Sequence, residues 1–185
     1  AREQRNLHVL KECAPLETRA AFRTDWRACA AASYAAGTLD RAMPFGPAPG
    51  GLYELLADTL DRWAARTPGA ASLPRFELRL LQELGLAPGW DACAKCRADL
   101  RGGAPARLDA AHGALWCETC AEGRGQAISA AALDAIRQMR GNVLPAALPE
   151  RAFREVRAIM GGLLEHQADF SPQAREIAFQ TLAAG

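Results

Sequence analysis

The sequence lacks any long hydrophobic run and any excess of charge of one sign. No apolar stretch approaches the roughly 20 residues that a membrane-spanning helix needs, and the first residues do not have the pattern of a secretory signal. The 22 basic residues are almost balanced by 21 acidic ones, so the composition is not that of a strongly basic nucleic-acid-binding chain. These absences argue against a membrane protein, and the composition alone does not indicate a function.

Lysine and recognisable catalytic motifs are also scarce. Only Lys11 and Lys95 are lysines, and the accompanying abundance of alanine makes GC-rich coding a simpler cause than selection for arginine contacts. The sequence contains no glycine-rich phosphate loop, no Gly-x-Ser-x-Gly elbow, no His-Glu-x-x-His and no convincing carboxylate pair. We therefore expect neither an enzyme nor a site for a small-molecule substrate.

Four of the six cysteines form two matched pairs, Cys93-x-x-Cys96 and Cys117-x-x-Cys120. This spacing is typical of a four-thiolate zinc site, in which two tight turns each present two thiolates to one metal. Glycine and proline between the pairs predict a short β-hairpin. Because four cysteines leave no open coordination position, the sequence predicts one structural Zn²⁺ bound by Cys93, Cys96, Cys117 and Cys120.

Other interpretations of the cysteines remain open at this point. Two disulfides would need an oxidising compartment, a redox-active pair usually occurs singly, and iron accepts the same four thiolates as zinc. Outside the two pairs, Cys13 and Cys29 are interpreted as small buried side chains and His112 as a surface turn residue.

The remainder of the chain has helical periodicity. The sequence predicts a short strand at 6–12, a turn-rich connection at 44–51 and an N-cap at Ser171. Apolar residues spaced three and four apart predict six helices, at about 17–40, 52–66, 74–86, 130–140, 150–168 and 172–183. The fold class expected is mainly α: a helical bundle with an inserted small four-cysteine zinc module, built as a treble-clef or ribbon-like hairpin at about 90–124.

The predicted first helix places Phe22, Trp26, Ala30 and either Ser33 or Tyr34 on one apolar face. Two arginine series also share helix faces: Arg19, Arg23 and Arg27, and then Arg151, Arg154 and Arg157. Such series bind phosphates or an acidic peptide, and the alternative interpretation is an exposed face paired with nearby carboxylates such as Asp25 and Glu150.

The order of the motifs resembles the family of the bacterial DNA repair protein RecO. Phe76-Glu-Leu-Arg-Leu-Leu-Gln-Glu-Leu-Gly-Leu-Ala-Pro precedes Cys93-Ala-Lys-Cys96, and His112-Gly-Ala-Leu-Trp-Cys117-Glu-Thr-Cys120 follows. The stretch Gly51-Leu-Tyr-Glu-Leu-Leu-Ala also resembles the helical domain of this family. The resemblance extends from about residue 6 to the end. His112 stands where the family has the first glycine of a pair, which predicts a different hairpin turn.

The resemblance implies a non-enzymatic recombination mediator of the RecF pathway type, located in the cytoplasm at the nucleoid. Proteins of this family bind and anneal single-stranded DNA, bind the tail of single-stranded-DNA-binding protein, and act with RecR to load RecA. By this resemblance, residues 1–16 are a remnant strand and linker from a preceding OB-fold domain, which carries most DNA contacts. Residues 17–185 are the α-helical domain. Arg19, Arg23 and Arg27, close to the expected barrel, are candidates for contacts to DNA or the acidic tail.

Two other functions stay open on the sequence. One is a zinc-stabilised adaptor that binds proteins and has no DNA contact of its own. The other is a thiol redox or metal sensor that uses the cysteine pairs.

Overall fold

The structure is a computed structural model that describes residues 12, 14, 17–43, 50–141, 148–168, 170 and 172–183. Three sequence predictions lie outside these residues: most of the strand at 6–12, residues 44–49 of the connection, and the Ser171 cap.

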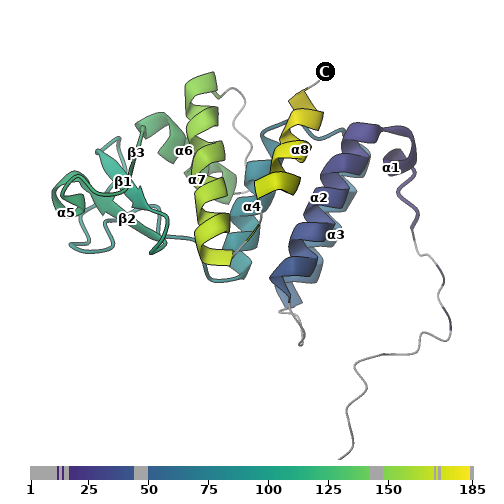
Figure 1. The fold of residues 1–185 in the computed structure, drawn as a ribbon, viewed down its shortest axis with the longest axis horizontal. Helices are drawn as coiled ribbons and strands as arrows, with labels where there is room; N and C mark the ends of the chain where they lie inside the picture. The colour runs from purple at the N-terminus through teal and green to yellow at the C-terminus, as the bar shows by residue number, and fades with distance from the viewer. Residues whose placement is uncertain are drawn as a thin grey trace, which may run out of the picture.

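The described residues form helices that surround a shared core, with a small sheet at one end (Figure 1). The helices α1, α2 and α3 lie at the opposite end from the sheet, and α4, α6, α7 and α8 lie between them. The fold class is therefore confirmed as mainly helical. The helices are α1 (Ala21–Thr24), α2 (Trp26–Ala42), α3 (Gly50–Ala65), α4 (Ser72–Glu83), α5 (Glu118–Ala121), α6 (Ala130–Arg140), α7 (Glu150–Ala168) and α8 (Pro172–Ala183).

None of the described helices is long and apolar enough to cross a membrane.

The helical body, which we define as α1–α4 and α6–α8, is held together by apolar stripes that face one another. On α7 the buried positions follow the predicted three-and-four spacing through Val156, Met160 and Leu163. Helix α4 packs against α3, α6 and α7 and therefore buries most of its length. It ends where Gly85, at φ +70°, donates to Gln82 O while Leu86 N–H donates to Leu81 O. These two bonds close the helix as a Schellman motif.

The predicted single helix over 17–40 is wrong, because the chain breaks at Asp25. Asp25 is extended (φ −112°, ψ 106°), and its carboxylate accepts from Arg27 N–H and Ala28 N–H, which makes it the N-cap of α2. The predicted apolar face is only partly right: Tyr34 is buried and Phe22 packs against the core, but Trp26 is 58% exposed. The buried positions of α2 are Ala28, Ala31, Tyr34, Ala35, Thr38 and Leu39.

A buried polar link joins four helices of the body. Glu77 of α4 is fully buried and accepts from Tyr34 Oη of α2 at 2.6 Å. Arg175 of α8 donates to the same carboxylate through Nε at 2.7 Å and Nη2 at 2.9 Å, and its Nη2 also donates to Arg157 O of α7. Burial and the adjacent carboxylate raise the pKa of Tyr34 above its usual range. The hydroxyl therefore stays protonated and remains a donor to Glu77.

The sheet belongs to a small unit inserted between α4 and α6, which we call the cysteine module (residues 91–128). Strands β1 (Ala106–Asp109) and β2 (Ala114–Cys117) pair antiparallel, with Leu108 opposite Leu115, as the predicted hairpin requires. A third strand that the sequence analysis did not predict, β3 (Gln126–Ile128), pairs with the other edge of β1. Gln167 of α7 donates from Nε2 to Ala110 O and Ala111 O at 2.8 Å each, and so fixes the hairpin turn to the helical body.

Candidate functional site

The first cysteine pair lies on a tight hairpin before the sheet. Cys93 N–H donates to Ala98 O at 2.8 Å, and Arg97 N–H donates back to Cys93 O at 2.9 Å. Arg97 takes a left-handed conformation (φ 63°), which turns the chain sharply enough for Cys93 and Cys96 to point the same way. The local backbone therefore forms the first of the two predicted turns.

The second pair lies where β2 passes into α5. Cys117 is the last residue of β2 and the N-cap of α5, and Cys120 follows in that helix. Arg107 of β1 holds the chain after α5, because its Nε donates to Arg124 O at 2.9 Å and its Nη2 to Gly125 O at 2.8 Å. This clamp fixes the second turn against the sheet.

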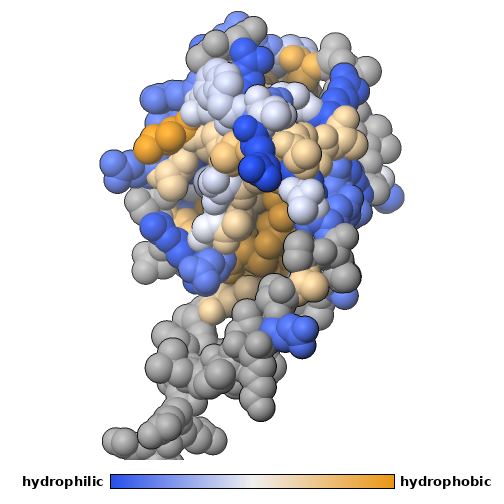
Figure 2. Space-filling view, turned by 90° about the vertical axis from the view of Figure 1, so that its right-hand side faces the viewer, coloured by the Kyte–Doolittle hydropathy of each residue, from blue (hydrophilic) through white to orange (hydrophobic). Residues whose placement is uncertain are grey.

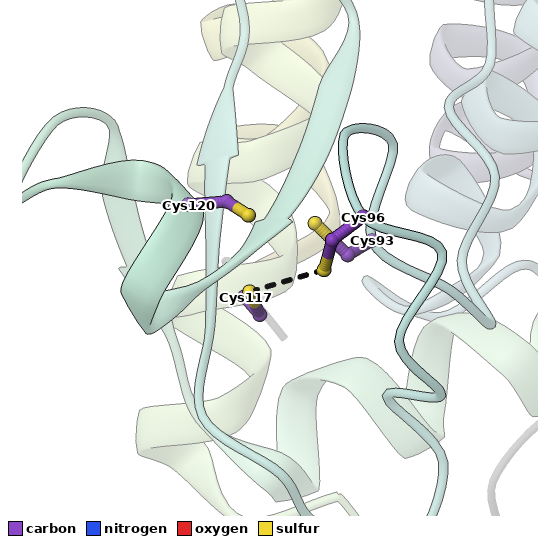
Figure 3. Close-up of side chains that lie close together, drawn as sticks. All are labelled: Cys93, Cys96, Cys117 and Cys120. Carbon is purple, nitrogen blue, oxygen red and sulfur yellow. Dashed lines mark hydrogen bonds between the residues drawn. The ribbon is translucent and has the colours of Figure 1, made fainter.

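All four thiols converge on one point (Figure 3). Their Sγ atoms lie within 4.8 Å of one another, and Cys96 Sγ lies 3.7 Å from Cys117 Sγ. A tetrahedral metal with bonds of about 2.3 Å to sulfur separates its ligands by about 3.8 Å, so the spacing fits such a centre. The described cysteines, including these four, form no disulfide. The structure thus brings together the four predicted ligands in an arrangement that could hold a metal ion.

The electrostatics of the cluster favour a bound cation. Burial opposes ionisation of Cys93, but N–H donors from Cys96, Cys117 and Lys95 outweigh it and lower the pKa of its thiol to about 6. Contacts with the Cys117 and Cys96 thiols raise the pKa of Cys120 to about 12. Without a cation, one thiol favours the thiolate while another is kept neutral by its neighbours. A divalent metal would offset two of the four thiolate charges and so let all four cysteines ionise together.

Arg137 of α6 attaches the cysteine module to the helical body, and sequence reasoning did not single it out. Its side chain is 13% exposed, and Nη2 donates to Trp90 O and to Leu100 O at 2.8 Å each. Those carbonyls flank the hairpin that carries the first cysteine pair. An isolated arginine on an amphipathic helix gives no sequence signal for this role.

The structure tests two of the three predictions made for the remaining cysteines and for His112. Cys29 is exposed on α2, so its interpretation as a buried side chain is wrong. Cys13 lies outside the described residues. His112 is an exposed residue of the hairpin turn, as predicted, and its Nδ1 lies 2.7 Å from Asp109 Oδ2.

The predicted arginine series are not uniform basic stripes. The break at Asp25 separates Arg23 in α1 from Arg27 in α2, while Arg19 precedes both helices and pairs with Asp61 at 2.7 Å. The three side chains therefore do not share one helix face, and their contact to DNA or a peptide stays a prediction. In the second series the alternative interpretation holds, because the arginines pair with carboxylates: Arg151 with Glu155, Arg154 with Glu150 and Arg157 with Glu176.

A different group of arginines lines a groove between α3 and α4, which we call the basic groove. It has a volume of about 680 Å³ and is lined by Arg62, Arg66, Arg75 and Arg79 together with Trp63, Phe76 and the turn from Thr67 to Ser72. Trp63 and Phe76 are buried and meet edge to face, with ring centroids 6.0 Å apart. The groove therefore combines an aromatic floor with a cationic rim.

The positive charges of the basic groove are close enough to affect one another. Burial lowers the pKa of Arg75, and the neighbouring Arg62 and Arg79 lower it further. Asp58 compensates part of this charge through contacts with Arg62 and, at 3.3 Å, Arg79. Sequence reasoning missed this group, although Arg62 and Arg66, and then Arg75 and Arg79, are each four residues apart at facing ends of consecutive helices.

The fold, the four-cysteine cluster and the basic groove together define the class of protein: a helical domain with a basic groove and an inserted module whose four cysteines could hold a metal ion. Residues 23–176 match the family model described as Recombination protein O C terminal. Because this match covers most of the chain, the chain belongs to that family.

The most similar relatives include proteins named DNA repair protein RecO. The one from Anaeromyxobacter sp. (strain K) is 40% identical over 121 residues, which are 62% of this chain and 47% of the relative. The one from Myxococcus xanthus (strain DK1622) is 43% identical over 72 residues, 37% of this chain and 28% of the relative. The one from Moorella thermoacetica is 29% identical over 122 residues, 66% and 45% respectively. The chain spans about half the length or less of these relatives.

Proposed function

We propose that this chain is the partner-binding part of a non-enzymatic recombination mediator in DNA repair. In this role it binds the acidic tail of single-stranded-DNA-binding protein, contacts single-stranded DNA, and acts with RecR to promote RecA loading in the cytoplasm at the nucleoid. Family membership and the names of the relatives support the repair role. The observation that carries the partner assignment is the basic groove.

The basic groove suits an acidic peptide that ends in an apolar residue. Arginine guanidinium groups pair with carboxylates through two parallel hydrogen bonds, and four of them surround the groove. The edges of Trp63 and Phe76 that line the groove offer a small apolar surface for the terminal side chain. Arg66 is exposed at the rim, where an arriving carboxylate meets it first.

We also propose that Cys93, Cys96, Cys117 and Cys120 hold a structural Zn²⁺. Bound there, the metal supplies a cross-link between the two turns and no open coordination position for a reactant. The spacing of the thiols and their mutual effect on ionisation support this assignment. The protein residues themselves fix the two turns, through the backbone bonds around Cys93 and the Arg107 clamp.

The test is a fluorescence anisotropy titration of this chain with a labelled tail peptide of its own single-stranded-DNA-binding protein, at low and at moderate salt. We expect saturable binding that weakens when the terminal apolar residue of the peptide is removed. Arg66→Ala and Arg79→Ala should each weaken binding about tenfold, because each removes a charge-assisted hydrogen bond worth about 1.5 kcal/mol.

The matched control is Arg154→Ala, which removes an exposed arginine of α7 that pairs with Glu150. It should leave the affinity unchanged. Absence of binding at both salt concentrations, or equal losses in Arg154→Ala and the groove variants, would contradict the placement of the tail in the basic groove.

A further inference from the structure

Trp26 is unusual among the tryptophans of this chain because it remains largely in water. It is 58% exposed, while Trp63 and Trp90 are 6% and 1% exposed and Trp116 is half-buried. The indole lies at the first residue of α2, and the turn before it is well fixed. Asp25 caps the helix and also accepts a hydrogen bond from Thr67 Oγ1. The exposed ring is therefore held on a rigid support.

Arg27 gives this ring a cationic neighbour. Its Cζ lies 5.4 Å from the centroid of the Trp26 ring, within the range of a cation–π contact. The Nε of Arg27 is buried and has no hydrogen-bond partner among the described residues. The Arg27 side chain is only partly exposed, so the helical body holds its guanidinium beside the indole.

Trp26 also adjoins the basic groove. Thr67, which donates to Asp25, lines the groove next to Arg66, so the residue before Trp26 is bonded to the groove lining. Arg23 in the last turn of α1 is exposed and adds a further positive charge three residues before Trp26. Figure 2 views this end of the molecule and shows strongly hydrophilic residues around an area of paler and hydrophobic ones. An exposed aromatic ring with a cationic neighbour thus follows directly on a residue that is bonded to the groove lining.

We infer that Trp26 and Arg27 form a stacking site for a base of single-stranded nucleic acid, with the strand running from this ring into the basic groove. Single-strand binding combines aromatic stacking of unpaired bases with a cationic track for the phosphates, and both features are present here. Duplex DNA does not fit the site because its bases are already stacked. The inference rests on the proposed function only in that the chain contacts single-stranded DNA.

The test is a titration of the chain with an oligo-dT of about 20 nucleotides at low salt, followed by tryptophan fluorescence and by anisotropy. Stacking on the exposed ring should quench its emission. Trp26→Leu should abolish that quenching and weaken binding roughly 5- to 100-fold, whereas Trp26→Phe should retain most of the affinity. Arg27→Gln should weaken binding and lower the salt slope by about one phosphate contact.

Two controls make the result specific. Tyr53→Leu removes an aromatic side chain that is 74% exposed in the first turn of α3. The fourteen residues from Tyr53 to Thr67 span about 20 Å along a helix, so this variant should bind like the unaltered chain. An abasic oligomer, which has phosphates but no bases, should bind more weakly and leave Trp26 emission unchanged.

The outcomes separate this inference from the proposed function. Equal affinity of Trp26→Leu and the unaltered chain for oligo-dT, with unchanged thermal unfolding, would overturn the stacking site. Lack of any oligo-dT binding, while the acidic tail peptide still binds, would overturn it and leave the basic groove assignment intact. If Trp26→Leu unfolds at a lower temperature, its loss of affinity cannot be assigned to stacking. The stacking site is then tested by Arg27→Gln and by the abasic oligomer, because neither alters the Trp26 side chain: unchanged affinity in both would overturn it.

Discussion

The helical body and the cysteine module differ in what stabilises them. The body buries facing stripes of leucine, isoleucine, phenylalanine and methionine and adds the buried Glu77 link. The module has strands of three or four residues, and most of its turns require glycines with positive φ: Gly102, Gly103, Gly113, Gly123 and Gly125. The module adds Leu100, Leu108, Leu115 and Ile128 to the core of the body, but a unit with so few buried side chains of its own normally needs a cross-link. The two regions should therefore respond differently to the same perturbation.

Metal removal should separate the two regions most strongly. Structural zinc contributes about 10–16 kcal/mol of apparent binding free energy in small metal-dependent folds, so chelation or Cys120→Ser should unfold residues 91–128. Hydrogen exchange should then become fast across the module, while α3, α4 and α7 keep their protection.

Cys29→Ser is the matched control for this prediction, because Cys29 is an exposed cysteine of α2 outside the cluster. Metal analysis should find one bound metal in Cys29→Ser and none in Cys120→Ser. A module that stays protected after complete metal removal would show that the sheet is stable by itself.

Loss of the buried carboxylate should affect the body and spare the module. Glu77→Ala leaves the guanidinium of Arg175 and the hydroxyl of Tyr34 buried without their acceptor. Removing one partner of a buried ion pair costs about 3–5 kcal/mol, which urea unfolding followed by circular dichroism would measure. Metal content should not change.

The double substitution Glu77→Leu/Arg175→Met sharpens the test, because it removes both charges and restores apolar volume. It should recover most of the lost stability. If the double variant is as unstable as Glu77→Ala, the buried link stabilises the fold by more than the cost of burying its two charges.

Arg137→Ala should loosen the junction between the two regions. The carbonyls of Trp90 and Leu100 would each lose a donor, at a cost of about 2 kcal/mol. Hydrogen exchange should rise in residues 90–100, and metal affinity should fall. Arg140→Ala, which removes an exposed contact to Asp91, should cost less than about 0.5 kcal/mol. Equal effects of the two variants would show that the Arg137 hydrogen bonds do not couple the regions.

Local patterns in the sequence predicted the features that depend on local chemistry. The helices at 130–140, 150–168 and 172–183 have the predicted bounds, because each has an uninterrupted apolar stripe. The paired cysteines predicted the four-thiol cluster that could hold a metal ion, since each pair is set by the geometry of one tight turn.

The features that the sequence did not predict have two causes. One is competition between two local signals, and the other is packing between segments that are distant in the chain. At Asp25 the helical period continues, but the carboxylate caps a new helix and rotates Trp26 into solvent. The basic groove exists only because a turn places the end of α3 beside the start of α4. The role of Arg137 depends on carbonyls about forty residues away in the chain. Neither the groove nor the Arg137 contacts have a fixed sequence spacing, and the Asp25 cap competes with a helical period that runs through it.

Two glycine substitutions give the smallest effects and should have opposite signs in the two regions. Gly125 in the module has φ +75°, and an added Cβ would lie 2.6 Å from Leu108 O, so Gly125→Ala should destabilise the module by about 1–2 kcal/mol. Gly37 lies within α2, and a Cβ there meets nothing within 4 Å. Gly37→Ala should therefore stabilise the body by about 0.5–1 kcal/mol, because alanine loses less backbone entropy in a helix. Denaturant midpoints with metal bound would measure both changes, and a destabilising Gly37→Ala would mean that the outer face of α2 packs more tightly than an open helix surface.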